Sequence, residues 1–237
     1  MKTAIFLFNS SSVAYQPWLD SGDWNIVTVD FSDTDHSGTA RKGPTIDPRV
    51  CALDMDLSLD GAVEYIYAIV DALEWAEPSF VLSFAPCSHL AVSGAAHYKK
   101  KREVNANFQT DAVALAKLVL QFDCPSIVEN PVSVLASLWK KPAGYVHPWQ
   151  FGDLLPADDV HPEFPEYYPP NDRYNKKTGL WCSKGAVLPV GTCTDDPKGE
   201  PNPCHVKLGG KSARTKYIRS MTPRGLAMGI YLANGVK

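Results

Sequence analysis

The regular alternation of short apolar runs with helical patterns is the feature that most restricts how this chain can fold. Five apolar runs have the length of buried strands, and apolar residues at helical spacing fill several of the intervals between them. Strands that alternate with helices form a parallel sheet with helices on both faces. The sequence therefore predicts an α/β protein with a Rossmann-like sheet, whose strands are expected at residues 3–8, 24–29, 50–53, 80–84 and 126–128.

Other local patterns predict the segments between these strands. Residues 32–49 are polar and rich in Gly, Thr and Pro, which is typical of a surface loop. Thr222 and Pro223 suit an N-cap and a first helical position, so a last helix is expected to begin there. Further helices are expected at residues 13–20, 61–75 and 103–122, the last as one long amphipathic helix.

A change of composition near residue 140 predicts the domain organisation. Residues 1–140 contain the strand and helix patterns and are expected to form the cofactor-binding and catalytic domain. Residues 141–210 lose periodicity and are rich in proline and aromatic side chains, so we expect a small irregular lobe on the target side rather than a disordered linker. Residues 211–237 are expected to form a C-terminal segment and helix that pack back on the catalytic domain.

The charge of the chain bears on whether its partner is a nucleic acid. A net charge of −3 does not by itself indicate a nucleic-acid partner, but local patches matter more than the sum. Two basic clusters, at residues 99–102 and 207–224, are candidate patches, although solvated loops explain them as well.

Cellular location is predicted from apolar run lengths and cysteine usage. No apolar run is long enough to span a membrane, and the apolar stretch near the N-terminus is too short for a secretory signal. The six cysteines lack the spacing of a disulfide framework. We therefore expect a cytoplasmic protein with no membrane partner.

Polar side chains follow all five predicted strands. They are the Asn9–Ser12 stretch and the single residues Asp30, Asp54, Cys87 and Glu129. Ligands of open parallel sheets bind outside the carboxyl ends of the strands. The five features are therefore expected to share one site.

The pair of Cys87 and Glu129 carries the most chemical information. A thiolate that adds at C6 of cytosine breaks the aromaticity of the ring and makes C5 nucleophilic, and an acid near N3 stabilises the resulting charge. A cysteine in a proline-anchored loop and a glutamate at the next strand end fit these roles. Taken singly, Cys87 is more often a structural thiol and Glu129 a partner in a loop ion pair. Their order along the chain favours the chemical interpretation.

In these residues the chain resembles the cytosine-C5 DNA methyltransferase family, especially its short members from phages and prophages. Pro86-Cys87 and Glu129-Asn130 match the dipeptides that carry the nucleophile and the acid in that family. The resemblance implies that Cys87 is the nucleophile, Glu129 the acid and Asn130 a residue that fixes the acid's loop. It also implies DNA as substrate and methyl transfer to C5 of cytosine, and it extends over residues 85–94, 147–152, 177–181 and 214–223.

The same resemblance implies S-adenosylmethionine as the cofactor, bound at the ends of the first three strands. Asp30 stands where an acid commonly bonds ribose hydroxyls, and Asp54 matches the position that faces the adenine ring. A helix cap or a solvated turn is the alternative for both. The family has a glycine-rich loop after the first strand, and this chain has none there. The residues expected to replace it are Phe8, Asn9, Ser10, Ser11 and Ser12.

A second departure concerns DNA contacts. Longer members have a Gln-x-Arg-x-Arg element, whereas Gln150 is followed here by a long insertion rich in proline and acidic residues. The lobe is small, so we expect few bases to be read and low sequence specificity. A solvated basic face is the alternative for the residues expected to contact phosphate, which are Lys176, Lys177, Arg214, Lys216 and Arg219.

Two questions of ligand and function stay open at this point. Cys182, Cys193, Cys204 and His205 lie in one lobe but lack a Cys-x-x-Cys spacing, so we favour scattered thiols over zinc and predict no metal. The rival functions are C5 chemistry on a cytosine nucleotide, a different donor, and a non-catalytic DNA-binding relative.

Overall fold

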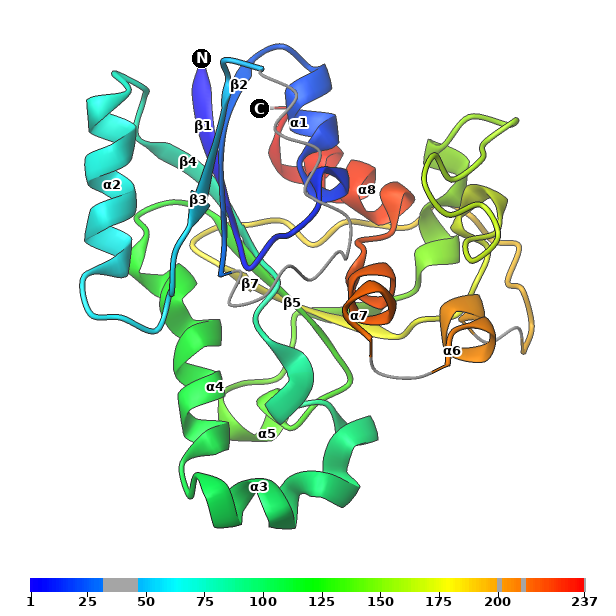
Figure 1. Ribbon diagram of the computed structural model, residues 1–237. Coiled ribbons are helices and arrows are strands. Elements are labelled where there is room, and N and C mark those ends of the chain that lie inside the picture. The colour runs from blue at the N-terminus through cyan, green and yellow to red at the C-terminus, as the bar shows by residue number, and fades with distance from the viewer. Residues whose placement is uncertain (32–46, 200–201, 210–211, 237) are drawn as a thin grey trace.

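The computed structural model describes residues 1–31, 47–199, 202–209 and 212–236, and within these ranges the strands form one seven-stranded sheet (Figure 1). The order across the sheet is β3-β2-β1-β4-β5-β7-β6. In chain order the strands are β1 (Lys2–Leu7), β2 (Trp24–Asp30), β3 (Val50–Asp54), β4 (Pro78–Ser83), β5 (Ser126–Pro131), β6 (Gly144–Val146) and β7 (Thr178–Ser183).

The sheet is parallel except at β7. Strands β3, β2, β1, β4 and β5 pair in parallel, and β7 runs antiparallel to both β5 and β6. The chain moves outward from β1 to β3 and then returns to place β4 on the other side of β1. That reversal is the topological switch point at which α/β sheets of the Rossmann type bind ligands. The predicted α/β class is confirmed, and the sheet is mixed, with the five predicted strands parallel.

Helices cover both faces of the sheet because side chains of each strand alternate between the faces. Ile5 and Leu7 of β1 face a core completed by α2 and α4, whereas Ala4 and Phe6 face a core completed by α1 and α8. Figure 1 shows α2 on one side of the sheet and α1 and α8 on the other.

The α-helices are α1 (Gln16–Asp20), α2 (Ala62–Ala72), α3 (Tyr98–Val104), α4 (Phe108–Lys117), α5 (Leu135–Leu138), α6 (Pro203–Lys207), α7 (Ala213–Ser220) and α8 (Arg224–Asn234). Short 3₁₀ helices are η1 (Ser12–Ala14), η2 (Cys87–His89), η3 (Val92–His97), η4 (Leu118–Gln121), η5 (Pro148–Leu154) and η6 (Pro170–Asp172).

Strands were predicted better than helices. All five expected strands are present, and each begins and ends within three residues of its predicted limits. The helix expected at 61–75 is α2. The helix expected at 13–20 is split into η1 and α1, and the last helix begins at Arg224, just after the expected Thr222 and Pro223. Of the loop expected at residues 32–49, residues 32–46 lie outside the described ranges.

The long helix predicted at residues 103–122 is wrong, because Asn105 breaks it. The chain forms α3, an extended residue at Asn105, then α4 and η4. The side chain of Asn105 accepts a hydrogen bond from the backbone N–H of Asn107 at 2.8 Å and donates one to Asp111 at 2.8 Å. Asparagine offers the backbone this local alternative to helical hydrogen bonds, and the apolar spacing alone does not register it.

The segment of residues 141–210 is only partly a separate lobe. Strands β6 and β7 come from it and complete the main sheet, so the sheet does not end at the expected boundary after residue 140. The remainder shares a small apolar core with α7 and is tied to α8 by a buried ion pair in which Arg224 donates to both oxygens of Asp159 at 2.6 Å. That core contains Tyr168, Tyr174, Cys204, Leu208, Ile218 and Met221.

Helix α8 packs closely because two of its residues are glycine. A Cβ added at Gly225 would lie 2.5 Å from the carbonyl oxygen of Phe151, and one added at Gly229 would lie 2.6 Å from its ring. Phe151 of η5, within one of the segments that resemble the family, therefore packs directly against α8. Among the described residues, no helix has the length and apolar character needed to cross a membrane.

Candidate functional site

The polar features predicted at strand ends lie along one edge of the sheet. Asp30 and Asp54 are the last residues of β2 and β3, and they are register partners. Cys87 opens η2 just after β4, and Glu129 lies in the last half of β5. Because these strands are parallel, the carboxyl ends meet at the same edge, as the sequence predicted.

The segment after β4, residues 85–91, carries Cys87 and is called here the β4 loop. Its position is set from β5, since the buried side chain of Asn130 donates a hydrogen bond to the carbonyl of Ala85 at 2.8 Å. Helix α3 supplies two more ties, from the hydroxyl of Tyr98 to the carbonyl of Ala91 at 2.8 Å and from the ammonium of Lys101 to the carbonyl of Ser88. The predicted role of Asn130 in fixing a loop thus has a structural counterpart, although the loop it holds is that of the cysteine.

Cys87 and Glu129 share an electrostatic environment. Cys87 is open to solvent yet surrounded by protein on most sides, and burial together with the Glu129 carboxylate raises the pKa of its thiol. Burial also raises the pKa of Glu129. The ammonium of Lys176 opposes the rise of both pKa values, and a hydrogen bond from Thr178 opposes that of Glu129. A thiol, a carboxyl group and an ammonium group therefore act on one another electrostatically at this site.

The segment after β1, residues 8–12, is called here the β1 loop, and it forms its turn without glycine. The left-handed residue is Phe8, with φ of 55°. Asn9 is buried and donates to the hydroxyl of Thr28 at 3.1 Å and to the carbonyl of Ser11 at 2.8 Å. Thr28 in turn donates to the carbonyl of Asn9 at 3.1 Å. This reciprocal pair fastens the loop to β2.

These residues fit the donor and acceptor needs of an adenosyl cofactor. In the described hydrogen-bonding pattern, the backbone N–H groups of Ser10 and Ser11 have no acceptor, so they can bind an anionic group. The carboxylates of Asp30 and Asp54 stand at the next two strand ends, where ribose hydroxyls and an adenine amine can be bound. The set therefore lies along the carboxyl ends of β1, β2 and β3.

The five residues expected to contact DNA do not form one group. Lys176 belongs to the Cys87 site, and the ammonium of Lys177 lies 4.7 Å from the centre of the Tyr145 ring. Arg214 and Lys216 are exposed on α7. Arg219 donates to the carbonyls of Cys204 and Leu208, so its guanidinium ties α7 to α6.

Other residues of the site carry no recognisable motif in the sequence. Thr28 and Thr178 act through contacts with segments that are distant in the chain, and a single sequence has no local signal for such contacts. Tyr98 and Lys101 reach the nearby β4 loop, and of these two only Lys101 was noted in the sequence, as part of a basic cluster. Each of the six cysteines is a free thiol, and the described residues contain no group of three or more His, Cys, Asp or Glu able to hold a metal. The side chain of His205, one of the four residues weighed for zinc, lies outside the description.

Comparison with known proteins adds no identification. No protein-family model matches the chain, and no curated protein matches its sequence.

Proposed function

We propose that this protein transfers a methyl group from S-adenosylmethionine to C5 of cytosine in DNA. The observation that carries the proposal is that Cys87, after β4, and Glu129, in β5, interact electrostatically with each other and with the ammonium group of Lys176. The resemblance of Pro86-Cys87 and Glu129-Asn130 to the methyltransferase dipeptides points to the same reaction.

Cys87 would act as the nucleophile in the first step. Its thiolate adds to C6 of cytosine, and the electron pair of the C5–C6 double bond moves toward N3, where Glu129 donates its proton. C5 is then nucleophilic and can accept the methyl group. Transfer of the C5 proton to solvent water, departure of the thiolate and return of the N3 proton to Glu129 restore the aromatic ring.

The environment of Glu129 suits the role of the acid. Burial raises its pKa, so a larger fraction of the carboxyl group is protonated near neutral pH than in water, and a protonated carboxyl can donate to N3. Protonation also removes the negative charge that raises the pKa of Cys87. The acid and the nucleophile are therefore coupled, since a neutral Glu129 favours the thiolate that the first step needs.

The cofactor would be held by the β1 loop and the two carboxylates at the ends of β2 and β3. When bound, S-adenosylmethionine supplies an electrophilic methyl group. The N–H groups of Ser10 and Ser11 would bind its carboxylate, Asp30 the ribose hydroxyls and Asp54 the adenine side. Phosphate contacts are proposed for the exposed Arg214 and Lys216 and for Lys177, while the contacts of Arg219 favour a structural role.

The test is the intact mass of the protein after incubation with S-adenosylmethionine and DNA that contains 5-fluorocytosine, which cannot lose its C5 substituent. A covalent adduct is expected for the wild type and for Cys193→Ala, a control that removes another partly exposed thiol. No adduct is expected for Cys87→Ala. An adduct that survives Cys87→Ala would contradict the assignment of the nucleophile.

The rival functions give different results in the same assay. Binding of S-adenosylmethionine without any adduct on DNA would favour a cytosine nucleotide as the substrate. An adduct that forms only with another methyl or alkyl donor would show that S-adenosylmethionine is not the cofactor. Salt-dependent DNA binding with neither adduct nor cofactor binding would favour a non-catalytic DNA-binding relative.

A further inference from the structure

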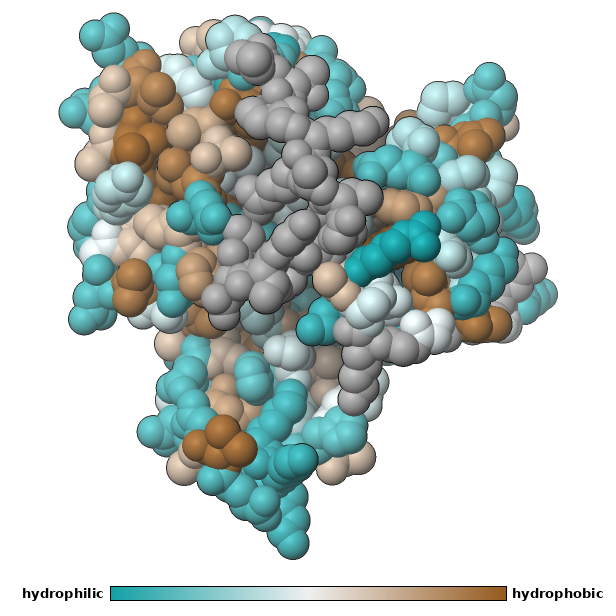
Figure 2. Space-filling view, in the orientation of Figure 1, coloured by the Kyte–Doolittle hydropathy of each residue, from teal (hydrophilic) through white to brown (hydrophobic). Residues whose placement is uncertain are grey.

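Helix α3 is strongly basic, and apart from the ties of Tyr98 and Lys101 to the β4 loop its side chains have no part in the proposed function. Its seven residues include Lys99, Lys100, Lys101 and Arg102 against one Glu103, so its net charge is +3 (four minus one), whereas the whole chain has −3. Figure 2 shows hydrophilic side chains over the surface that α3 forms. A local concentration of positive charge attracts anions even when the protein as a whole is acidic.

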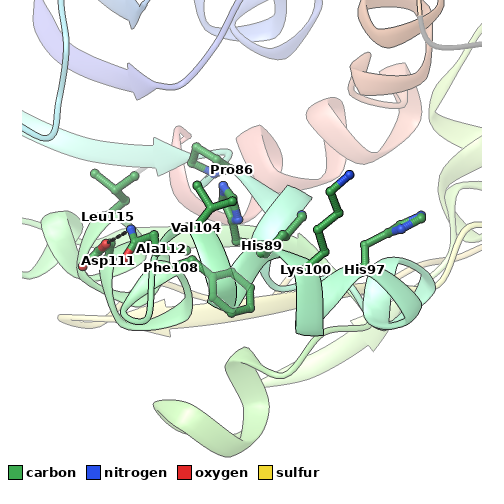
Figure 3. Close-up of a pocket in the computed structure, with 11 residues that line it drawn as sticks. Pro86, His89, His97, Lys100, Val104, Phe108, Asp111, Ala112 and Leu115 are labelled. Atoms are coloured by element: carbon green, nitrogen blue, oxygen red, sulfur yellow. Dashed lines mark hydrogen bonds between the residues drawn. The ribbon is translucent and has the colours of Figure 1, made fainter.

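A cavity of about 470 Å³ lies between α3, α4 and the β4 loop (Figure 3). Its wall is largely apolar, with Pro86, Val104, Phe108 and Leu115, and its basic groups come from Lys100 and Lys101. This volume lies in the range of sites that hold small organic ligands. The combination of an apolar wall with ammonium groups suits a ligand that has a flat apolar part joined to an anionic group.

Two aromatic rings of the cavity lining pack against each other. The rings of His89 and Phe108 are in edge contact, with centroids 5.6 Å apart. The Nδ1 atom of His89 is enclosed and has no hydrogen-bond partner among the described residues. The one acid of the lining, Asp111, accepts a hydrogen bond from the Asn105 amide at 2.8 Å.

We infer that this cavity binds a second, unpaired nucleotide of the DNA strand that presents its cytosine to Cys87. The base would lie against Phe108 and Val104, with its phosphate near Lys100. Pro86 and His89 line the cavity and flank Cys87 in the sequence, so the cavity and the nucleophile share one loop. The inference rests on the proposed function for its choice of DNA as the ligand.

The test measures binding of a short, fluorescein-labelled, single-stranded oligodeoxythymidine by anisotropy over a range of salt concentrations. This probe has no cytosine, so its binding does not depend on the chemistry at Cys87. Lys100→Ala is expected to weaken binding and to lower the slope of log K against log salt by about 0.7, as for one lost phosphate contact on a single strand. Val104→Ser is expected to weaken binding roughly tenfold with the slope unchanged.

Matched controls exist for both variants. Val104 is 86% exposed and Val190 is 81% exposed, so neither substitution should disturb folding, and Val190→Ser should bind as the wild type does. Lys198→Ala is the corresponding control for Lys100→Ala, because Lys198 is exposed and does not line the cavity.

The outcomes separate this inference from the proposed function. No binding by the wild type, wild-type affinity of Val104→Ser, or an unchanged salt slope for Lys100→Ala would each overturn the nucleotide cavity. Any of these results together with a Cys87 adduct on 5-fluorocytosine DNA would leave the methyltransferase proposal standing. Weaker binding by both variants without an adduct would support the cavity and overturn the methyl-transfer chemistry.

Discussion

The β1 loop and the β4 loop leave the same edge of the sheet, and each is fastened by an asparagine amide, but from opposite sides. In the β1 loop the asparagine belongs to the loop, and Asn9 reaches out to Thr28 on β2. In the β4 loop the asparagine belongs to the neighbouring strand, and Asn130 of β5 donates to the carbonyl of Ala85.

The origin of each asparagine tie determines which parts of the site should respond to the same substitution. Asn130 follows Glu129 directly, so one strand sets both the position of the acid and that of the loop that carries Cys87. The asparagine tie of the β1 loop runs from its own side chain to β2 and does not involve β5. We therefore expect a change at β5 to alter nucleophile and acid together, and a change at Asn9 to affect the cofactor alone.

Loss of the tie from β5 should have the largest effect. In Asn130→Ala the carbonyl of Ala85 loses its buried donor, which should lower the free energy of unfolding by about 1–3 kcal/mol. A misplaced Cys87 should slow adduct formation with 5-fluorocytosine DNA roughly 100-fold. Ser133→Ala is the control, because the buried hydroxyl of Ser133 has no partner among the described residues. Wild-type rates for Asn130→Ala would mean that the β4 loop holds its position without β5.

Loss of the tie within the β1 loop should affect cofactor binding. In Asn9→Ala the loop is released from Thr28, so S-adenosylmethionine measured by calorimetry should bind roughly tenfold more weakly, as expected when binding must order the loop. Alkylation of Cys87 should keep its wild-type rate. Asn25→Ala removes a buried asparagine from the start of β2 and should leave cofactor affinity unchanged. A slower alkylation of Cys87 in Asn9→Ala would break the proposed independence of the two loops.

The charges around Cys87 should change its reactivity severalfold in opposite directions. The Glu129 carboxylate raises the pKa of the thiol, so Glu129→Gln should lower that pKa, increase the thiolate fraction at neutral pH and speed alkylation by iodoacetamide. The Lys176 ammonium lowers the same pKa, so Lys176→Met should slow alkylation. The rates should converge at high pH, where every variant is ionised.

Lys177→Met is the control for the charge experiment, since the ammonium of Lys177 lies over the Tyr145 ring and does not contribute to the pKa shift of Cys87. An unchanged rate for Lys176→Met would remove Lys176 from the site and return it to the candidates for phosphate contact.

The comparison of the loops also explains what could be read from the sequence. Strand positions and the polar residues at strand ends were predictable because burial of a parallel strand leaves a continuous apolar run that stops at the site. The break at Asn105 was missed because a side-chain hydrogen bond, not apolar spacing, decides it. Strands β6 and β7 were missed because their pairing with distant segments, rather than local periodicity, makes them strands.

The smallest expected effect concerns the left-handed residue of the β1 loop, for which the described β4 loop has no equivalent. A non-glycine residue at positive φ is strained by about 1 kcal/mol or more. Phe8→Ala removes the half-buried ring but keeps the strain, whereas Phe8→Gly removes both. The glycine variant should therefore be more stable than the alanine variant by about 1 kcal/mol in denaturant unfolding, even though both lose the contacts of the ring with the core.

Glycine at this position should also bring S-adenosylmethionine affinity to at least the wild-type level, because it allows closer approach of the backbone to the cofactor. An alanine variant as stable as the glycine variant would mean that Phe8 is not held in the left-handed region. The β1 loop would then differ from the β4 loop only in the direction of its asparagine tie.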